Sequence, residues 1–296
     1  MTLGKLDRAL MADVEALERE GRAKAPERVI VGYEPPADER GPRYRLRAAD
    51  RPFIRMNSNS YLSLSHHPKL MEAADEATHD FGVGPGAVRF IDGTFAHHVQ
   101  LERRIAEYLD RPAAKIFNSA YTANLGQALA IASDATFWIG DALNHNSIIR
   151  AMRIAGVPRA AKAIYRHNDM DDLGRKLEEI PDGIRRVVVI FDGVFSMRGD
   201  VAPVDEINRR LEPHRDRFPE GVVTVIDDSH GIGAFGATGR GTEEHAGARA
   251  DIVVGTFGKA FGVNGGFVAS SPAVIEAIRQ KADTYIYTNP LGVADC

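Results

Sequence analysis

The sequence predicts an α/β fold in which a mostly parallel β-sheet lies between two layers of helices. Short apolar runs and helical stretches alternate along most of the 296 residues, as is typical of strand–helix–strand units. The apolar runs are continuous, as expected of strands buried on both faces. Polar and charged residues follow several runs directly, at the strand ends where such sheets bind their ligands.

The composition is that of an ordinary water-soluble protein, with 44% apolar residues, 26% charged residues and a net charge of −4. This balance gives no sign of binding to nucleic acid or to an anionic membrane. The single cysteine, Cys296, is the last residue, which excludes a disulfide framework and a cysteine metal site. No apolar run approaches the about 18 residues of a membrane-spanning helix, and the start is charged, so we expect a cytoplasmic protein without a membrane segment.

Residues 1–56 are expected to form an N-terminal helix and a linker. Apolar residues recur there at spacings of three and four, the period of an amphipathic helix; they are Leu3, Leu6, Leu10, Val14 and Leu17. We expect this helix to cover part of a core or a partner subunit. The polar, proline-bearing stretch 35–52 is predicted to link it to the main domain, which should span 57–296.

The main domain is predicted to alternate strands and helices. Strands are predicted at the apolar runs 115–118, 136–140, 186–192, 222–227, 251–256 and 266–270. Helices are predicted around and between them, at 99–109, 122–132, 147–155, 171–179, 203–211 and 272–281. Because parallel strands end at the same edge of their sheet, the residues that follow the runs should gather there.

The stretch TFGKAFG at 256–262 follows one such run and carries Lys259 on a loop of small residues. A compact amine in a pocket of this kind loses its proton easily, which suits it to Schiff-base chemistry. A surface lysine on a glycine turn is the alternative for this stretch taken alone.

The run at 222–227 ends in Asp227, and His230 follows three residues later. A carboxylate at this position can pair with a protonated ring nitrogen, and the histidine can donate to a phenolate oxygen. Both residue types also bind metals, but neither an HExxH motif nor a second histidine cluster accompanies them.

Three further strand ends carry polar groups. Ser196 follows the run at 186–192, where a serine often only caps the backbone. His145 follows the run at 136–140 and could stack on a planar cofactor or have a structural role. The stretch 118–124 joins the run at 115–118 to a predicted helix, whose free N–H groups could seat a phosphate; no GxGxxG or GK[ST] motif is present there.

These groups together match pyridoxal 5′-phosphate better than any other common cofactor. They supply a phosphate seat, a stacking histidine, a carboxylate for a ring nitrogen, donors to a phenolate, and a lysine.

The chain resembles the α-oxoamine synthases, pyridoxal-phosphate enzymes of aminotransferase fold type I. The resemblance covers about 57–289 and rests on ordered motifs: NSNSYLSL at 57–64, RFIDGT at 89–94 with His98 and Leu101-Glu102, DALNH at 141–145, DGVFSM at 192–197, DDSH at 227–230, TFGK at 256–259 and YTN at 287–289. It implies the large domain of that fold and a homodimer.

The resemblance also implies a role for each matching residue. Lys259 would bond to the cofactor aldehyde and move the substrate α-proton, while Asp227 would pair with the pyridinium nitrogen. His230 and Ser196 would contact the phenolic oxygen, and His145 would stack on the ring. The remaining residues would hold the phosphate or the substrate: Ala120, Tyr121 and Thr256 the phosphate of the same subunit, Thr288 and Asn289 that of the neighbouring subunit, and Asn57 the substrate.

The implied reaction condenses a small amino acid, for which glycine is the first candidate, with an acyl-CoA. It releases CoA and CO2 and yields an aminoketone. Two alternatives stay open: another fold-type-I activity, such as an aminotransferase or aldolase, and a truncated, inactive partner subunit that binds the cofactor.

The chain departs from the family at its end. Family members are longer and have a C-terminal lobe, which usually carries the arginine that binds the amino-acid carboxylate, and no such lobe follows 287–289 here. We therefore expect low activity and poor solubility of this chain alone.

Overall fold

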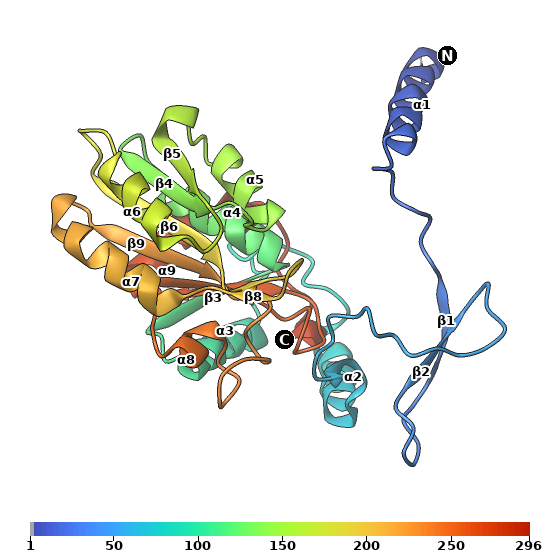
Figure 1. Ribbon diagram of the computed structural model, residues 1–296. Helices are drawn as coiled ribbons and strands as arrows, with labels where there is room; N and C mark the ends of the chain where they lie inside the picture. Colours follow the sequence, from blue (N-terminus) through green and yellow to red (C-terminus); the bar gives the residue numbers. More distant parts are fainter. Residues whose placement is uncertain (1–2) are drawn as a thin grey trace. The chain divides into compact units, whose positions relative to one another are not determined.

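The computed structural model describes residues 3–296 and divides into two compact units (Figure 1). The first unit ends at Ser58, and the second comprises Asn59–Cys296. Within residues 3–296, no helix is both long enough and apolar enough to cross a membrane.

The first unit contains helix α1 (Leu3–Arg19) and the antiparallel strands β1 (Ile30–Glu34) and β2 (Arg43–Leu46). The predicted helix is confirmed, but none of its described residues is buried. The expected covering of a core or a partner subunit by its apolar stripe stays a prediction.

The stretch 35–52 is not a simple link, because β2 lies inside it. Aromatic rings hold the hairpin together: Tyr44 lies 5.3 Å from Tyr33 and 6.2 Å from Phe53, measured between ring centroids. The Arg55 guanidinium lies 4.9 Å from the centroid of the Tyr44 ring. These aromatic contacts could not be predicted from the charged composition of the stretch, because they form only when the strands pair.

The second unit is built on a seven-stranded sheet with the order β3-β11-β10-β9-β6-β4-β5. Its strands are β3 (Ala113–Phe117), β4 (Thr136–Asp141), β5 (Lys162–Tyr165), β6 (Arg186–Asp192), β9 (Val222–Asp227), β10 (Ile252–Thr256) and β11 (Gly266–Ser270). Only β11 runs against the others. The mostly parallel sheet is therefore confirmed.

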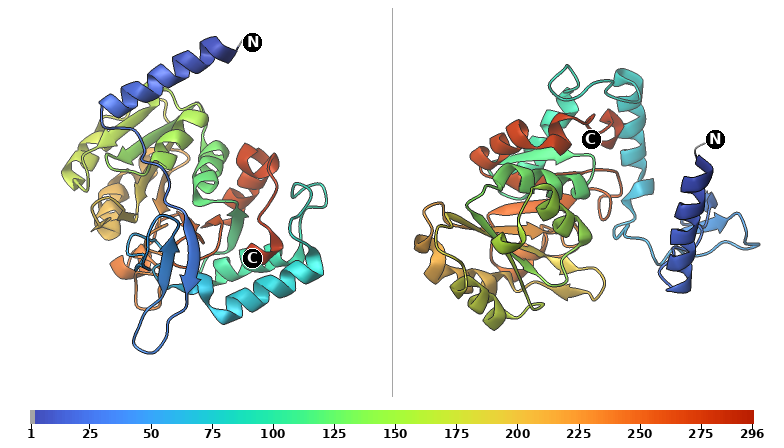
Figure 2. Two further views of the ribbon diagram at one scale, coloured as in Figure 1. Left: turned by 90° about the vertical axis from the view of Figure 1, so that its right-hand side faces the viewer. Right: turned by 90° about the horizontal axis from the view of Figure 1, so that it is seen from above.

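Helices cover both faces of this sheet, as Figures 1 and 2 show. One face packs against α4 (Ala120–Ile131), α5 (Asn146–Ile154) and α9 (Pro272–Lys281). The other packs against α3 (Ala96–Tyr108), α6 (Met170–Glu178) and α7 (Val204–Leu211). Residues of the central strands alternate between the two cores, since Val188 and Ile190 join one and Val187 and Val189 the other.

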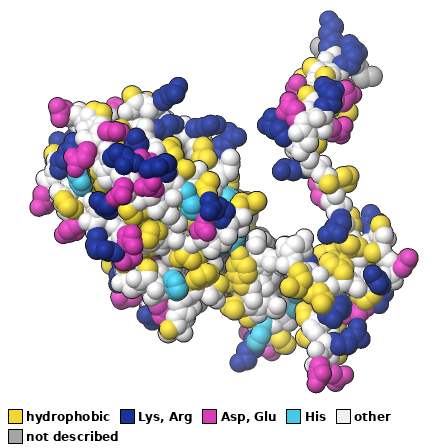
Figure 3. Space-filling model, viewed as in Figure 1, with side chains coloured by type: hydrophobic (Ala, Val, Ile, Leu, Met, Phe, Trp, Pro, Cys, Tyr) yellow, Lys and Arg dark blue, Asp and Glu magenta, His cyan; other side chains and the backbone are white. Residues whose placement is uncertain are grey.

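The remaining elements are short or lie outside the sheet. They are α2 (Pro68–Phe81), α8 (Thr242–Ala246), α10 (Asp283–Ile286), the hairpin strands β7 (Val194–Phe195) and β8 (Asp200–Val201), and the 3-10 turns Leu64–His66, Arg159–Ala161, Glu212–Arg217 and Val293–Asp295. On the face drawn in Figure 3, acidic and basic side chains are interspersed over the second unit.

Every strand and helix predicted in the main domain is present, and no predicted end differs from the observed one by more than three residues. The short elements α8, α10, β7 and β8 were not predicted, and neither were β5 and α2, for which the physical reason is plain. Strand β5 lies at the sheet edge with only Tyr165 buried, so it has no apolar run. Helix α2 buries only Ala77, so it shows little apolar periodicity.

Candidate active site

Strand register brings the ends of the sheet strands to one edge. Asp192 at the end of β6 lies beside Asp227 at the end of β9. Thr256 at the end of β10 lies beside Gly266, which in turn lies beside Phe117 at the end of β3. Residues separated by more than a hundred positions in the chain are thus neighbours.

Lys259 follows β10 by three residues and is half-buried. Burial lowers the pKa of its amine, and the carboxylates of Asp227 and Asp192 oppose that shift. These electrostatic effects require the amine and both carboxyl groups to share one neighbourhood. Because burial disfavours the charged form of the amine, the neutral, nucleophilic form is easier to populate near pH 7.

Asp227 is buried and both its carboxylate oxygens are held in place. The Asn124 amide donates to Oδ2 over 2.6 Å. The Ser229 hydroxyl and backbone N–H donate to Oδ1 over 2.6 and 3.1 Å. The carboxylate therefore has a fixed orientation at the end of β9, as a group that pairs with a ring nitrogen requires.

Asp192 is a second buried carboxyl group at this edge. Burial, and after it the neighbouring Asp227 carboxylate, raise the pKa of Asp192 to about 8. Its Oδ2 accepts a hydrogen bond of 2.9 Å from the His145 backbone N–H. Two like charges this close cannot both form cheaply, so Asp192 is the partner that keeps its proton near pH 7.

His145 caps the start of α5. Its Nδ1 lies 2.7 Å from the Ser147 hydroxyl, and Ser147 also accepts a hydrogen bond of 2.9 Å from the Asn124 amide. Asn124 therefore connects Asp227 to Ser147 and, through Ser147, to the turn between β4 and α5 that contains His145. The ring orientation is fixed, while its stacking on a cofactor stays a prediction.

His230 lies near the lysine. Burial lowers the pKa of His230 to about 4, and the positive charge of Lys259 acts in the same direction. Its Nδ1 lies 2.5 Å from the Tyr61 hydroxyl. With that hydroxyl donating to Nδ1, the ring proton sits on Nε2, which is then free to donate to an oxygen.

A seat for an anion forms where α4 meets β11. Ser119 caps α4 by accepting from the Thr122 N–H, and the first N–H groups of a helix have no acceptor inside it. Those of Ala120 and Tyr121 are available to a phosphate. Gly266 makes this approach possible, because a Cβ there would lie 2.2 Å from the Ala120 nitrogen.

The Thr256 hydroxyl forms hydrogen bonds within the loop 256–265, which carries Lys259. It donates to the Gly265 carbonyl over 3.0 Å and accepts from the Gly258 N–H over 3.1 Å. Its expected contact with the phosphate stays a prediction.

Four expected site residues lie in different settings. Ser196 is exposed in the turn between β7 and β8. Asn118, after β3, donates to Thr288 Oγ1 over 3.2 Å and to the Asn289 carbonyl over 2.7 Å, so both lie beside β3 of their own chain. Asn57 belongs to the first unit. The ligand contacts of these residues stay predictions.

Sequence reasoning missed Asn124, Ser229, Asp192 and Tyr61 as contributors to the site. Asn124 lies inside a helix, and Tyr61 lies in the 57–64 motif but far from every strand end, so neither was given a role. Asp192 and Ser229 adjoin strand ends already considered and could have been found by asking which neighbours a buried carboxylate needs.

The residues present fit a phosphate-bearing planar cofactor. Buried polar atoms are normally paired, yet Asp192 Oδ1 and Asn124 Oδ1 have no hydrogen-bond partner within residues 3–296. Together with the free N–H groups at the start of α4, they leave unused donors and acceptors at this edge of the sheet. Over the same residues, no group of three or more His, Cys, Asp or Glu side chains could hold a metal ion.

Comparison with known proteins gives consistent matches. The model of the aminotransferase class I and II family matches residues 51–294. The 8-amino-7-oxononanoate synthase of Thermoanaerobacter pseudethanolicus is 41% identical over 243 residues, which are 81% of this chain and 59% of the relative. That of Symbiobacterium thermophilum is 42% identical over 248 residues, 82% of this chain and 61% of the relative. The chain thus spans about three fifths of the length of these curated relatives.

Solved structures agree. A serine palmitoyltransferase from S. paucimobilis with bound PLP and myriocin has a TM-score of 0.81 and 30% identity, covering 99% of this chain and 70% of that one. The 8-amino-7-oxononanoate synthase from Francisella tularensis has a TM-score of 0.65 and 27% identity, covering 80% and 64%.

Proposed function

The chain belongs to the aminotransferase class I and II family, and we propose that it binds pyridoxal 5′-phosphate and acts as an α-oxoamine synthase. The observation that carries the proposal is the shared neighbourhood of Lys259, Asp227 and Asp192 at the sheet edge that also presents the start of α4. The similarity to 8-amino-7-oxononanoate synthases and serine palmitoyltransferase supports it.

Pyridoxal 5′-phosphate, when bound, supplies an electron sink for negative charge at the α-carbon of an amino acid. The chain would hold it at three points. Lys259 would bind it covalently through its amine, Asp227 would pair with the ring nitrogen, and the N–H groups of Ala120 and Tyr121 would bind the phosphate. Asn124 and Ser229 keep the Asp227 carboxylate aimed.

Lys259 would also move the substrate proton. Its pKa is lowered by burial, so an unprotonated amine is accessible to take the α-proton and to return a proton later. The Nε2–H of His230 and the Ser196 hydroxyl would donate to the phenolic oxygen, and His145 would cover the ring.

The overall reaction would join the α-carbon of a small amino acid, with glycine as the first candidate, to the acyl carbon of an acyl-CoA. The carbon–sulfur bond breaks, CoA leaves as its thiol, the amino-acid carboxylate leaves as CO2, and an aminoketone results. Asn57 is proposed to contact the substrate. Thr288 and Asn289 are proposed to reach the phosphate of a second subunit in a homodimer.

A second candidate stays open, namely a cofactor-binding subunit that is inactive alone. Cofactor absorbance without turnover, and co-purification with a longer homologue, would select this candidate.

The test is CoA release with glycine, alanine and serine against short- and long-chain acyl-CoAs. We expect release with at least one pair, and none from Lys259→Ala. Lys281→Ala, at the exposed end of α9, is the control and should match the unmodified chain. Amino-group transfer to a 2-oxo acid without CoA release would contradict the proposed reaction and favour an aminotransferase.

A further inference from the structure

Two residues that follow the edge strand β5 join two loops of the candidate site. His167 Nδ1 lies 2.9 Å from Asp141 Oδ1, and His167 Nε2 lies 2.9 Å from Asp200 Oδ2. Asp141 ends β4 and Asp200 begins β8. The His167 side chain is only 14% exposed and that of Asp141 is fully buried, so the imidazole is a bridge within the fold.

Asn168 makes the same connection a second time. Its N–H donates to Asp141 Oδ2 over 2.9 Å, and its side-chain amide donates to the Val201 carbonyl over 3.2 Å. It has a left-handed φ of 50°, which asparagine tolerates better than most residues. We call Asp141, His167, Asn168 and Asp200 the His167 clamp.

One end of the His167 clamp fixes the turn between β4 and α5, which contains His145. Asp141 Oδ1 also accepts a hydrogen bond of 2.8 Å from the Leu143 N–H, which begins the turn between β4 and α5. Two residues later, the His145 N–H reaches Asp192. A shift of the Asp141 carboxylate would therefore shift His145.

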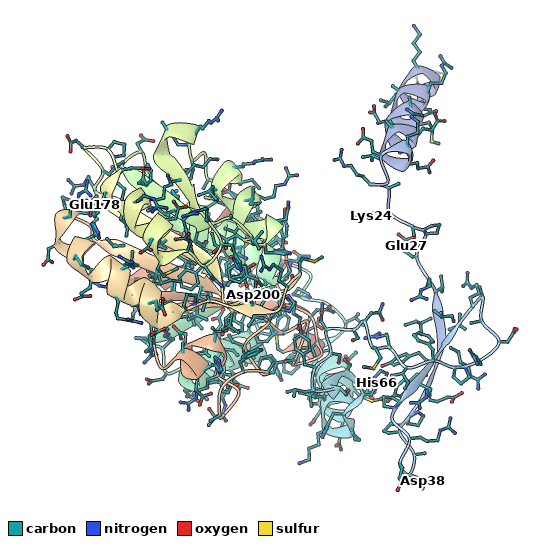
Figure 4. The ribbon with its side chains drawn as sticks, viewed as in Figure 1. Lys24, Glu27, Asp38, His66, Glu178 and Asp200 are labelled. Carbon is teal, nitrogen blue, oxygen red and sulfur yellow. The ribbon has the colours of Figure 1, made fainter. Side chains whose placement is uncertain are left out.

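The other end of the His167 clamp fixes the turn between β7 and β8, which contains Ser196. Asp200 is paired with Phe195 across the β7–β8 hairpin, and the turn that contains Ser196 joins these two strands. Figure 4 labels Asp200 on this segment. The Phe195 ring meets the His167 ring edge-on at 4.4 Å between centroids, and Arg198 pairs with Asp200 over 2.8 Å.

We infer that His167 is a positioning residue that fixes the His145 loop and the Ser196 turn relative to each other. The two nitrogens of an imidazole lie on opposite edges of one rigid planar ring, so His167 contacts Asp141 and Asp200 at the same time. This geometry is why a histidine suits the place.

The inference rests on the proposed function only for its effect on the cofactor; the mechanical link does not depend on it. The first experiment is therefore hydrogen exchange on the cofactor-free chain, comparing His167→Asn with His214→Asn. His214 is a matched control, because its side chain is 13% exposed and lies 3.6 Å from a carboxylate of Glu178.

We expect His167→Asn to speed exchange together at the amides of 143–145 and 198–202, at least about tenfold by loss of two hydrogen bonds. His214→Asn should leave both segments unchanged. Faster exchange confined to 165–169, or at only one of the two segments, would overturn the inference. If His167→Asn does not fold, Asp200→Ala is used instead, because it removes the contact between His167 and Asp200 at the more exposed end of the clamp.

The second experiment measures pyridoxal 5′-phosphate itself. We expect His167→Asn to weaken its binding about tenfold, as loss of a supporting contact does at metal sites, and to change the ratio of its visible to near-ultraviolet absorption bands. A lower melting temperature with unchanged affinity and spectrum would show a merely structural role. Absence of binding by the unmodified chain would refute the proposed function, while the exchange experiment would still decide the clamp.

Discussion

At the residue scale, two neighbouring aspartates have opposite tasks because their surroundings differ. Asp227 accepts hydrogen bonds at both carboxylate oxygens, which fixes the orientation of the carboxylate. Asp192 accepts one hydrogen bond from the described part of the chain, which leaves its Oδ1 without a partner there, and its pKa is raised to about 8. One site thus offers a fixed carboxylate to a ring nitrogen and, beside it, a carboxyl group that carries a proton.

Replacing Asp227 with asparagine tests the first task. Asp227→Asn keeps an oxygen that can accept from Ser229 or Asn124, so the fold should persist. Without its charge, the ring nitrogen would lose the partner that keeps it protonated, and turnover should fall at least about 100-fold. CoA release and thermal melting measure the two effects. Near-normal turnover would argue against the role given to Asp227.

The Asp192 carboxyl group predicts a pH dependence of stability. Because its pKa rises from 3.8 to about 8 on folding, the native chain binds more protons than the unfolded chain between those values. Its contribution is therefore present at low pH and is lost as pH rises through about 8, by at most about 1.4 kcal/mol per pH unit.

Asp192→Asn should flatten this decline in melting temperature between pH 5 and pH 9. The slope should not vanish, because burial also raises the pKa of Asp228 to about 7. Asp182→Asn, at an exposed position, is the control. Parallel melting profiles of Asp192→Asn and the unmodified chain would count against the raised pKa.

At the element scale, the sheet edge organises the site, and this is the part that sequence predicts best. Continuous apolar runs marked β3, β4, β6, β9 and β10, and the residues after them could be assigned to one edge by the rule for parallel strands. Asn124 and Tyr61 could not be assigned, since only the packing of α4 and the path of the chain before α2 bring them to Asp227 and His230. The His167 clamp could not be predicted either, because His167 and Asn168 follow β5, which has no apolar run in the sequence.

Contact between β11 and the start of α4 gives an element-scale prediction. A methyl group in Gly266→Ala would meet the Ala120 nitrogen at 2.2 Å and the Ser119 carbonyl carbon at 2.4 Å, and backbone cannot yield cheaply there. We expect a loss of about 2 kcal/mol or more in the free energy of unfolding, and weaker phosphate binding. Gly84→Ala, with no atom within 4 Å of the added carbon, is the control in urea unfolding. Equal unfolding midpoints would contradict this packing.

At the scale of the whole molecule, the site is proposed to be shared between two chains. Thr288 and Asn289 lie on an exposed segment tied to β3 through Asn118, and Tyr287 beside them is 78% exposed. A segment anchored at its own strand end but open to solvent suits contact with a second copy.

Subunit complementation tests this sharing. Lys259→Ala and Thr288→Ala/Asn289→Ala chains should each fail to retain the cofactor. Coexpressed with different tags, they should form mixed dimers in which one of the two sites is intact, so the purified mixed dimers should regain about half of the normal visible absorbance. No recovery in purified mixed dimers would show that each site is made within one chain.

The most direct test of the central claim is borohydride reduction of the chain loaded with pyridoxal 5′-phosphate, followed by peptide mass spectrometry. Reduction makes a carbon–nitrogen link between lysine and cofactor permanent. We predict a single phosphopyridoxyl adduct, on the peptide that contains Lys259. An adduct on another lysine, or none on a chain that has bound the cofactor, would contradict the account.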